Sequence, residues 1–403
     1  MTRGTPNYKL LGQLCTRITD GTHQTPLYQD EGVVFISAKN VKDGQLDFAD
    51  RKYISRQEHD FLTKSSKPVA GDLLLTKSGS LGDAVVIPEL DFEFSIFESL
   101  ALLKPRKDLV DSHYLHQYIR SPEAAGYFHS ITTGLAVKHL HLGDLRKLRV
   151  FLPPLPKQQE IAKRLSTWDA AIQKTEGLIA AKERHYSLEL YRLISRGHHP
   201  RGHVGVFAHE ISERYRGGNW RTVALSDIAT VWKGQQLNKD AMVEDGAYYA
   251  LNGGVTPSGR TTEWNCEADT ITVSEGGNSC GFVSYNSENF WCGGHCYALK
   301  ELAKDVDAHY LFHYLKGKQT RLMALRVGSG LPNIQKSDLE AFLVILPDLA
   351  KQNAIARYLN ALREEIALLG QSVEALKQQK RGLMQKLLTG QWRVKAEEEE
   401  VAA

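Results

Sequence analysis

The chain has 403 residues, of which 42% are hydrophobic and 24% charged, and its net charge is +3 at pH 7. This length exceeds one ordinary domain, and the composition is that of a globular protein with more than one core. No apolar run approaches the ~18 residues of a membrane-spanning helix, and the N-terminus lacks a signal-peptide layout, so we expect a cytoplasmic protein without a membrane partner. The five cysteines, an odd number, are expected to be free thiols.

Charge is spread along the chain rather than gathered in one basic region. Residues 218–350 hold 11 Lys and Arg against 15 Asp and Glu, so this segment is net acidic. A protein of this kind that binds nucleic acid needs local basic clefts, or a partner that supplies much of the phosphate neutralisation.

One stretch occurs twice without gaps, at Leu152–Leu165 and at Leu346–Leu359. Both copies contain Leu-Pro, Leu, Lys-Gln, Ile-Ala and Leu at the same offsets. Proline lacks a backbone donor and suits the first turn of a helix. Each copy therefore predicts a strand end, a turn and the start of a helix.

A long heptad pattern follows each copy, with apolar residues alternating in steps of three and four and one charged interruption at Lys380. We expect the two helices to pair with each other as an antiparallel coiled coil; two unrelated surface helices are the alternative. The predicted seam consists of Leu165, Trp168, Ile172, Ile179, Tyr186, Leu190, Leu193, Leu359, Leu362, Ile366, Leu369, Val373, Leu376, Leu383 and Leu387.

The repeat also extends upstream of these helices. Asp111–Tyr118 matches Asp307–Tyr314, an amphipathic helix with an acidic cap, and Asp72–Gly79 matches Asp269–Gly276, a strand that enters a Gly/Ser turn. The first half carries extra residues at roughly positions 45 to 70, so loops there differ. We predict an α+β fold that duplicates one unit with pseudo-two-fold symmetry, a mostly β domain followed by a long helix.

The expected organisation has six segments. They are a globular domain at 1–156, a helix at 157–197, a Gly/His-rich linker at 198–218, a second globular domain at 219–350, a second helix at 351–393 and an acidic, disordered tail at 394–403.

Enzymatic motifs are missing from the sequence. It contains no Gly-x-x-x-x-Gly-Lys-Ser/Thr phosphate loop, no Gly-x-Gly-x-x-Gly after a strand and no Asn/Asp-Pro-Pro-aromatic tetrapeptide of adenine methyltransferases. Zinc at Cys266, Cys280, Cys292 and Cys296, with His295, stays a minor alternative because the Cys-x-x-Cys knuckle is absent. We assign no catalytic residue, no metal ligand and no cofactor to this chain.

Four loops carry side chains suited to phosphates or base edges, and Lys39 with Asn40 and Asn252 with Arg260 are further candidates outside them. Small polar residues and glycines in the two Gly turns let the backbone approach a groove, and amides, histidines and cations supply donors and acceptors. The candidate DNA-binding residues are Lys39, Asn40, Lys77, Ser78, Ser80, Lys138, His139, His141, Asn252, Arg260, Asn278, Ser279, Asn333 and Gln335.

Several of these features together carry a family resemblance. They are the two Leu-Pro-x-Leu-x-Lys-Gln signatures, their Ile-Ala and heptad continuations, the Gly-Asp-Leu-Leu strand at 71–74 and the Gly-Leu elements at 134 and 330. With them the chain resembles the specificity (S) subunit of type I restriction–modification enzymes. The resemblance covers almost the whole chain. It implies that each globular part is a target recognition domain, reading one half of a bipartite site in double-stranded DNA. It also implies that the paired helices form a spacer.

The same resemblance implies the partners. Two modification (methyltransferase) subunits dock on the chain, restriction (motor-nuclease) subunits can join them, and S-adenosylmethionine, ATP and Mg belong to those partners. The Cys-rich second domain, the His-rich connector and the acidic tail depart from the family pattern. Two other readings stay open: a two-headed protein-interaction scaffold without a nucleic-acid role, and an enzyme with an unrecognised site in the Cys-rich half.

Overall fold

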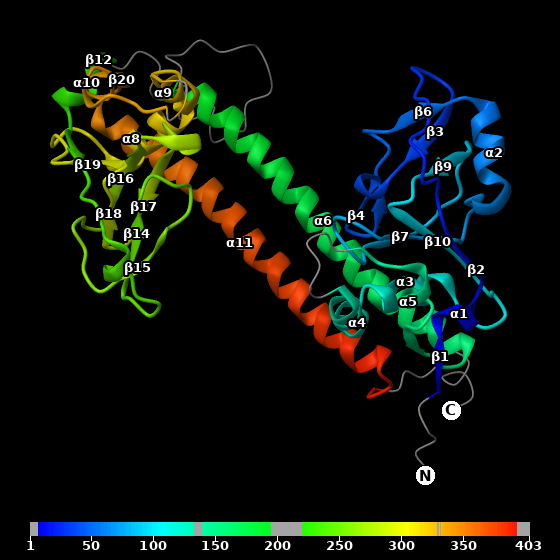
Figure 1. Cartoon of the computed structure of the whole chain (residues 1–403). Helices are drawn as coiled ribbons and strands as arrows, with labels where there is room; N and C mark the ends of the chain where they lie inside the picture. Colours follow the sequence, from blue (N-terminus) through cyan, green and yellow to red (C-terminus); the bar gives the residue numbers. More distant parts are fainter. Residues whose placement is uncertain (1–6, 133–138, 195–219, 329, 331, 393–403) are drawn as a thin grey trace. The chain divides into compact units, whose positions relative to one another are not determined.

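The computed structural model describes residues 7–132, 139–194, 220–328, 330 and 332–392. Contacts divide the chain into a first unit, residues 1–175 with 372–403, and a second unit, residues 176–371. Each unit contains one globular part and a segment of both long helices, α6 (Leu155–Ile194) and α11 (Leu349–Leu388) (Figure 1). The predicted linker at 198–218 and tail at 394–403 lie outside the described residues.

Three sheets and a small hairpin form the strands of the first unit. The largest sheet is antiparallel with the order β2-β10-β7-β8, the second has the order β6-β3-β9 with β3 parallel to β9, and β1 pairs with β11. The strands are β1 (Tyr8–Leu10), β2 (Cys15–Asp20), β3 (Val33–Ile36), β4 (Val41–Lys42), β5 (Gln45–Leu46), β6 (Lys52–Ile54), β7 (Leu73–Thr76), β8 (Ala84–Val86), β9 (Phe94–Ile96), β10 (Leu100–Pro105) and β11 (Arg149–Phe151). The helices are α1 (Leu11–Leu14), η1 (Ala38–Asn40), α2 (Arg56–Ser66), α3 (Ser112–Ile119), α4 (Pro122–Thr132) and α5 (Leu142–Leu145).

The second unit repeats these sheets strand for strand. Its orders are β13-β19-β16-β17, β15-β14-β18 with β14 parallel to β18, and β12-β20. The strands are β12 (Arg221–Ala224), β13 (Thr230–Lys233), β14 (Tyr248–Leu251), β15 (Gly259–Thr261), β16 (Thr270–Ser274), β17 (Val283–Asn286), β18 (Phe290–Cys292), β19 (Cys296–Lys300) and β20 (Leu343–Leu346). The helices are η2 (Leu225–Asp227), η3 (Lys239–Ala241), η4 (Gly277–Ser279), α8 (Ala308–Gly317), α9 (Gln319–Met323) and α10 (Lys336–Glu340).

The predicted duplication is thus confirmed, and so is the predicted difference in loops. Between β3 and β7 the first unit inserts the β4–β5 hairpin and the eleven-residue helix α2. The second unit has only the strand β15 and short connections between β14 and β16. Among the described residues, no helix has both the length and the apolarity to cross a bilayer.

The repeated Lys-Gln signature is a structural anchor in each unit. The fully buried side chain of Gln158 donates from Nε2 to the carbonyls of Leu109 and Pro153, at 3.0 and 2.8 Å, and its Oε1 accepts from the backbone N–H of Asp111 at 2.9 Å. Buried amides of this kind are stable only when their donors and acceptors are satisfied. Gln158 therefore joins the start of α6 to the start of α3.

Gln352 makes the same set of bonds in the second unit. Its Nε2 donates to the carbonyls of Asp305 and Pro347, at 3.0 and 2.9 Å, and its Oε1 accepts from the N–H of Asp307 at 3.0 Å. Asp307 caps α8 as Asp111 caps α3, in agreement with the predicted acidic caps. The signature thus repeats because it joins the long helix to the domain before it.

The predicted antiparallel pairing of the long helices is present within each unit. In the first unit Ile161 and Leu165, near the start of α6, belong to the same core as Met384 and Leu387, near the end of α11. In the second unit Leu190 and Ile194, near the end of α6, share a core with Ile355 and Leu359 at the start of α11. Both helices begin two residues before the predicted positions, because Pro153, Pro154 and Pro347 precede or open the first turn without blocking it.

The seam residues fall into two groups by burial. Fully buried positions are Leu165, Leu190, Leu193, Leu359, Val373 and Leu387, and half-buried ones are Trp168, Ile172, Ile179, Tyr186, Leu362, Ile366, Leu369, Leu376 and Leu383. Lys380, the one charged position of the predicted seam, lies in the interface as its heptad spacing predicts. Its side chain is buried, and Nζ donates to Oδ1 of Asp169 on α6 at 2.6 Å, so the charge belongs to the interface.

Candidate nucleic-acid interface

The Gly turns after β7 and β16 have the same backbone geometry. Gly79 and Gly277 have φ of 75° and 72°, and Gly82 and Gly281 both have φ of 84°. This left-handed region favours glycine, since a Cβ is strained there. A Cβ added to Gly79 or Gly277 meets no atom within 4 Å, so the outer side of each turn is open to an approaching ligand backbone.

The structure brings the predicted loops together in pairs. In the first unit the N–H of Leu140 donates to the carbonyl of Lys77 at 2.9 Å, so residues 139–141 lie beside the Gly turn. In the second unit the N–H of Ile334 donates to the carbonyl of Glu275 at 2.8 Å in the same way. Each unit therefore presents one continuous surface built from a Gly turn and a later loop.

The candidate residues of the first unit differ in accessibility. Ser80 and His141 are exposed and Ser78 and His139 half-buried, whereas Lys138 lies outside the described residues. Burial, together with the neighbouring charges of Lys77 and His141, lowers the pKa of His139. A neutral imidazole both donates and accepts hydrogen bonds, as contact with a base edge requires.

Three other candidates of the first unit are engaged within the protein. Lys77 is buried and paired with Asp20, and the buried amide of Asn40 donates to the carbonyls of Asp47 and Asp50. Lys39 is exposed but pairs with Asp50 at 2.6 Å. Buried, satisfied groups support the loops rather than reach a ligand, so we leave Lys77 and Asn40 out of the proposed contact surface.

The second unit reverses the charges of the pair behind its turn, and here the lysine is exposed rather than buried. Glu275 stands where the first unit has Lys77, and it accepts from Nζ of Lys233 at 2.7 Å and from the hydroxyl of Tyr297 at 3.0 Å. In both units the pair joins the ends of two strands that flank a central strand: β2 and β7 flank β10, and β13 and β16 flank β19. The two charges of the pair are exchanged between the units. The fold therefore requires an ion pair between these two strand ends, but it does not require a particular charge on either strand.

Amides dominate the candidate surface of the second unit. Asn278 and Gln335 are exposed, and Gln335 donates from Nε2 to Oδ1 of the half-buried Asn333 at 3.0 Å. Ser279 donates to the carbonyl of Gly253 at 2.5 Å. These amides offer both donors and acceptors at the turn.

The remaining two candidates of this unit support neighbouring loops. Arg260 donates to the carbonyls of Gly246 and Ala247, and Oδ1 of Asn252 accepts from the N–H of His295 at 3.4 Å. Arg260 is exposed and Asn252 half-buried, and Asn252 precedes Gly253, whose carbonyl accepts from the hydroxyls of Ser274 and Ser279 at the Gly turn.

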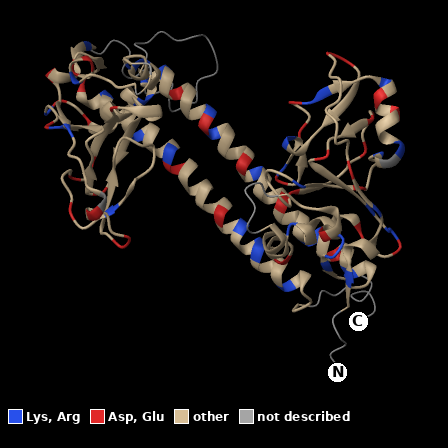
Figure 2. Cartoon of the chain, in the orientation of Figure 1, with Lys and Arg blue, Asp and Glu red and all other residues tan. Residues whose placement is uncertain are grey.

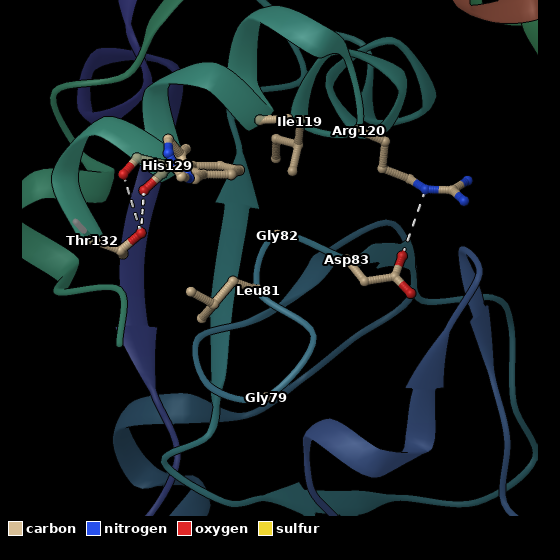
Figure 3. A pocket seen from close by; sticks show the side chains of 10 residues that line it. Gly79, Leu81, Gly82, Asp83, Ile119, Arg120, His129 and Thr132 are labelled. Carbon is tan, nitrogen blue, oxygen red and sulfur yellow. Dashed lines mark hydrogen bonds and ion pairs between the residues drawn. The ribbon is translucent and has the colours of Figure 1, made fainter. Parts of the chain in front are cut away.

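A pocket of about 400 Å³ adjoins the Gly turn of the first unit, between that turn and helices α3 and α4 (Figure 3). Arg120 and His129 line it on the helical side, and Nε of Arg120 lies 3.5 Å from Oδ1 of Asp83. Neither residue was predicted from the sequence. Arg120 directly follows α3, the helix that the second unit repeats as α8, and this position in the repeat could have marked it as a site residue.

The cysteines of the second unit belong to its core. Cys266, Cys292 and Cys296 share one apolar cluster, and Cys280 lies in another. Within the described part of the chain, no group of three or more His, Cys, Asp or Glu side chains is placed to hold a metal ion. All five cysteines are free thiols.

Comparison with known proteins decides the family. The model of the type I restriction modification DNA specificity domain matches the chain twice, at residues 8–183 and 217–378. The chain belongs to this family. The two matched segments coincide with the two halves of the structural duplication.

Relatives in two groups of organisms support this assignment. A Mycoplasma genitalium protein, provisionally named a type I specificity subunit, is 34% identical over 158 residues, which are 39% of this chain and 41% of that one. A second provisionally named subunit, from Mycoplasma pneumoniae, is 30% identical over 46% of its length. The chain therefore matches less than half of these relatives. The type I restriction enzyme MjaVIII specificity subunit of Methanocaldococcus jannaschii is 21% identical over 90% of this chain and 86% of its own.

The fold is that of a solved specificity subunit. The crystal structure of the S subunit of a type I restriction–modification system from M. genitalium superposes with a TM-score of 0.65 at 16% identity, covering 96% of this chain and 98% of that one. A structure from a study of type I restriction–modification complex assembly reaches 0.53 at 15% identity.

Proposed function

We propose that this chain is the DNA sequence-specificity subunit of a type I restriction–modification complex. Each unit reads one half of a bipartite target in double-stranded DNA through its Gly turn and the adjoining loop. The chain itself performs no chemistry in this proposal. It acts in the cytoplasm and determines where partner subunits act.

One observation carries the proposal: the two units have the same strand order but present different side chains at the same place. The first has serines and histidines at its turn, and the second has amides. Loops on a shared scaffold are where recognition diverges. Histidine, asparagine and glutamine are all side chains that read base edges in the major groove.

The long helices supply the spacer between the half-sites in this proposal. Each has 40 residues, and a helix of that length extends about 60 Å. DNA sites read on one face lie a helical turn or more apart, about 34–36 Å per turn. The target therefore consists of two short read segments with an unread spacer whose length the helices determine.

Partners complete the activity. Two modification subunits dock on the chain and bring S-adenosylmethionine, and restriction subunits add ATP and Mg. The chain has no phosphate loop and no methyltransferase tetrapeptide, so these cofactors belong to the partners.

Mapping methylated adenines in DNA modified by the reconstituted complex tests the proposal. We expect one methylated adenine on each strand, one in each half of a single bipartite sequence. Adding one heptad to both helices should lengthen the preferred spacer and leave both half-sites unchanged. Methylation at a continuous, spacer-free site, or methyl transfer by the purified chain alone, contradicts the proposal.

A further inference from the structure

A compensated charge cluster lies behind the recognition turn of the first unit. Arg120, at the end of α3, has Asp83 on one side and Asp169 on the other, at 3.5 and 3.9 Å. Asp169 also accepts from Lys380 at 2.6 Å and from Nε2 of Gln117 at 2.7 Å. Burial acting alone raises the pKa of Asp169, but Lys380 and these donors lower it overall. Two carboxylates thus face two cations.

The second unit replaces both carboxylates at the same places. Lys316 follows Tyr310 by six residues as Arg120 follows Tyr114, and both tyrosines donate to the carbonyl of the strand before the long helix. Arg363 follows the anchor Gln352 by eleven residues, the position of Asp169 after Gln158. Phe282, after the second Gly turn, stands where the first unit has Asp83. Lys316 therefore faces an aromatic ring where Arg120 faces a carboxylate.

The surroundings hold these cations in place but do not neutralise them. Nζ of Lys316 donates to the carbonyl of Val283 and to Oε1 of Gln319, both at 2.9 Å, and lies 3.8 Å from the centroid of the Phe282 ring. The guanidinium of Arg363 lies 4.7 Å from the ring of Phe312, which is one turn before Lys316 on the same face of α8. Over the residues that the structure covers, neither cation has a carboxylate within 4.0 Å.

This absence of a counter-charge is unfavourable in the free protein. Burial, and then the proximity of Arg363, lowers the pKa of Lys316 to about 8. Burial and Arg321 likewise lower the pKa of Lys318. An ammonium has three donors, and two of those on Lys316 are used, so one is left for a further acceptor.

The local sequence is basic although the unit as a whole is net acidic. Figure 2 marks Lys and Arg in blue and Asp and Glu in red along the ribbon. From Ala308 to Ser337 the chain has no Asp or Glu. The same stretch contains Lys316, Lys318, Arg321, Arg326 and Lys336. The corresponding stretch of the first unit, 112–141, has Glu123 beside Arg120 and Lys138. The stretch 308–337 thus contributes five cations and no carboxylate to the second unit.

We propose that Lys316 and Arg363 bind a phosphate of the DNA backbone in the half-site read by the second unit. The inference rests on the proposed function and adds a specific contact to it. The site lies directly behind the recognition turn, because Lys316 contacts Phe282 and Val283, the first residues after Gly281. A phosphate oxygen accepts the third ammonium proton and pairs with the guanidinium fork, so it supplies the negative charge that the carboxylates beside Arg120 supply in the first unit.

Salt dependence of DNA binding tests this site in the complete complex. The variants Lys316→Met and Arg363→Met remove one cation each, and Lys304→Met, at an exposed lysine beside Asp305, is the control. Each lost phosphate contact lowers the slope of log affinity against log salt by about 0.9 in magnitude. We expect this reduction for both variants and an unchanged slope for the control.

Arg363→Asp separates binding from folding. The new carboxylate takes the place of Asp169 of the first unit, so it should pair with Lys316 and raise the unfolding midpoint while the salt slope falls. A structural role for Arg363 predicts instead a lower midpoint.

The possible failures are distinct. If Lys316→Met, Arg363→Met and Arg363→Asp all keep the wild-type salt slope while the wild-type complex binds its specific sequence, the phosphate site is overturned and the proposed function stays in place. Absence of specific DNA binding by the wild-type complex overturns the proposed function. Weaker capture of the methyltransferase subunits with an unchanged salt slope assigns the cations to a protein carboxylate and also overturns the phosphate site.

Discussion

At one corresponding place between α6 and α11 the first unit has an ion pair where the second has neutral groups, although Lys182 and Glu365 also pair across the helices of the second unit, at 2.7 Å. In the first unit Lys380 donates to Asp169. Tyr186, which follows Gln158 by as many residues as Lys380 follows Gln352, has its hydroxyl 2.9 Å from Nδ1 of His313. Nε2 of the same ring lies 2.9 Å from Oδ1 of Asn360. Both units thus keep a hydrogen-bonded polar side chain at this place between α6 and α11, and it is charged only in the first unit.

The anchors of the frame behave differently, because they are the same in both units. Gln158 and Gln352 bond backbone groups, whose positions depend on the fold and not on neighbouring side chains. Side-chain pairs must change together, whereas a bond to the backbone constrains one residue only. The duplicated frame is therefore maintained by main-chain contacts, and charge pairs are free to diverge.

The largest expected effect concerns the anchors. Gln158→Leu and Gln352→Leu each leave three backbone groups without a partner, so each should lower the free energy of unfolding by roughly 3 kcal/mol, about 1 kcal/mol per group. Thermal unfolding measures this as a lower midpoint. The adjacent exposed residues supply matched controls, Gln159→Leu and Asn353→Leu, which should change little. A large effect in only one unit contradicts the shared frame.

Removing one ion of the first interface comes next. Lys380→Met leaves the half-buried Asp169 with only Gln117 and the more distant Arg120, at a cost of about 2 kcal/mol. Tyr186→Phe at the corresponding place in the second unit should cost only about 1 kcal/mol, the value of one neutral hydrogen bond. Lys174→Met, on the exposed surface of α6, serves as the control in thermal unfolding. Equal losses for both variants remove the distinction between the two interfaces.

Acidification should affect His313 and His116, one buried histidine from each unit. Burial lowers the pKa of both to about 4, with Arg120 adding to the effect at His116. An unfolded chain protonates these rings near pH 6.5, so unfolding takes up protons between pH 6.5 and pH 4. Stability is therefore lost as the pH falls through this window, by about 1.4 kcal/mol per pH unit for each ring.

His313→Gln, which introduces the residue of the first unit, isolates one of these contributions. Unfolding of this variant, followed from pH 6.5 to pH 4.5, should show a shallower pH dependence than the wild type. The same slope in both proteins means that His313 is already protonated in the fold or exposed in it.

Much of this frame could be predicted from the sequence, because it is encoded by local patterns. The Leu-Pro signatures predicted where α6 and α11 begin to within two residues, and Asp111 and Asp307 predicted the caps of α3 and α8. These features depend on backbone geometry and on residues close in sequence.

The site was less predictable, since its partners are distant in sequence. Lys77 pairs with Asp20 across 57 residues, and Lys380 pairs with Asp169 across 211. A lysine that reaches DNA and a lysine buried against a carboxylate have the same local pattern. The role proposed for Lys316 and Arg363 likewise depends on the groups around them, which the sequence offsets alone do not give.

Exchange of one recognition domain tests the central claim most directly. Residues 219–345 are replaced by the corresponding segment of another family member with a different target, and methylated adenines are mapped after modification by the reconstituted complex. The half-site read by the second unit should change to that of the donor, with the other half-site and the spacer retained. A change in both half-sites, or in neither, contradicts independent reading by two units on one frame.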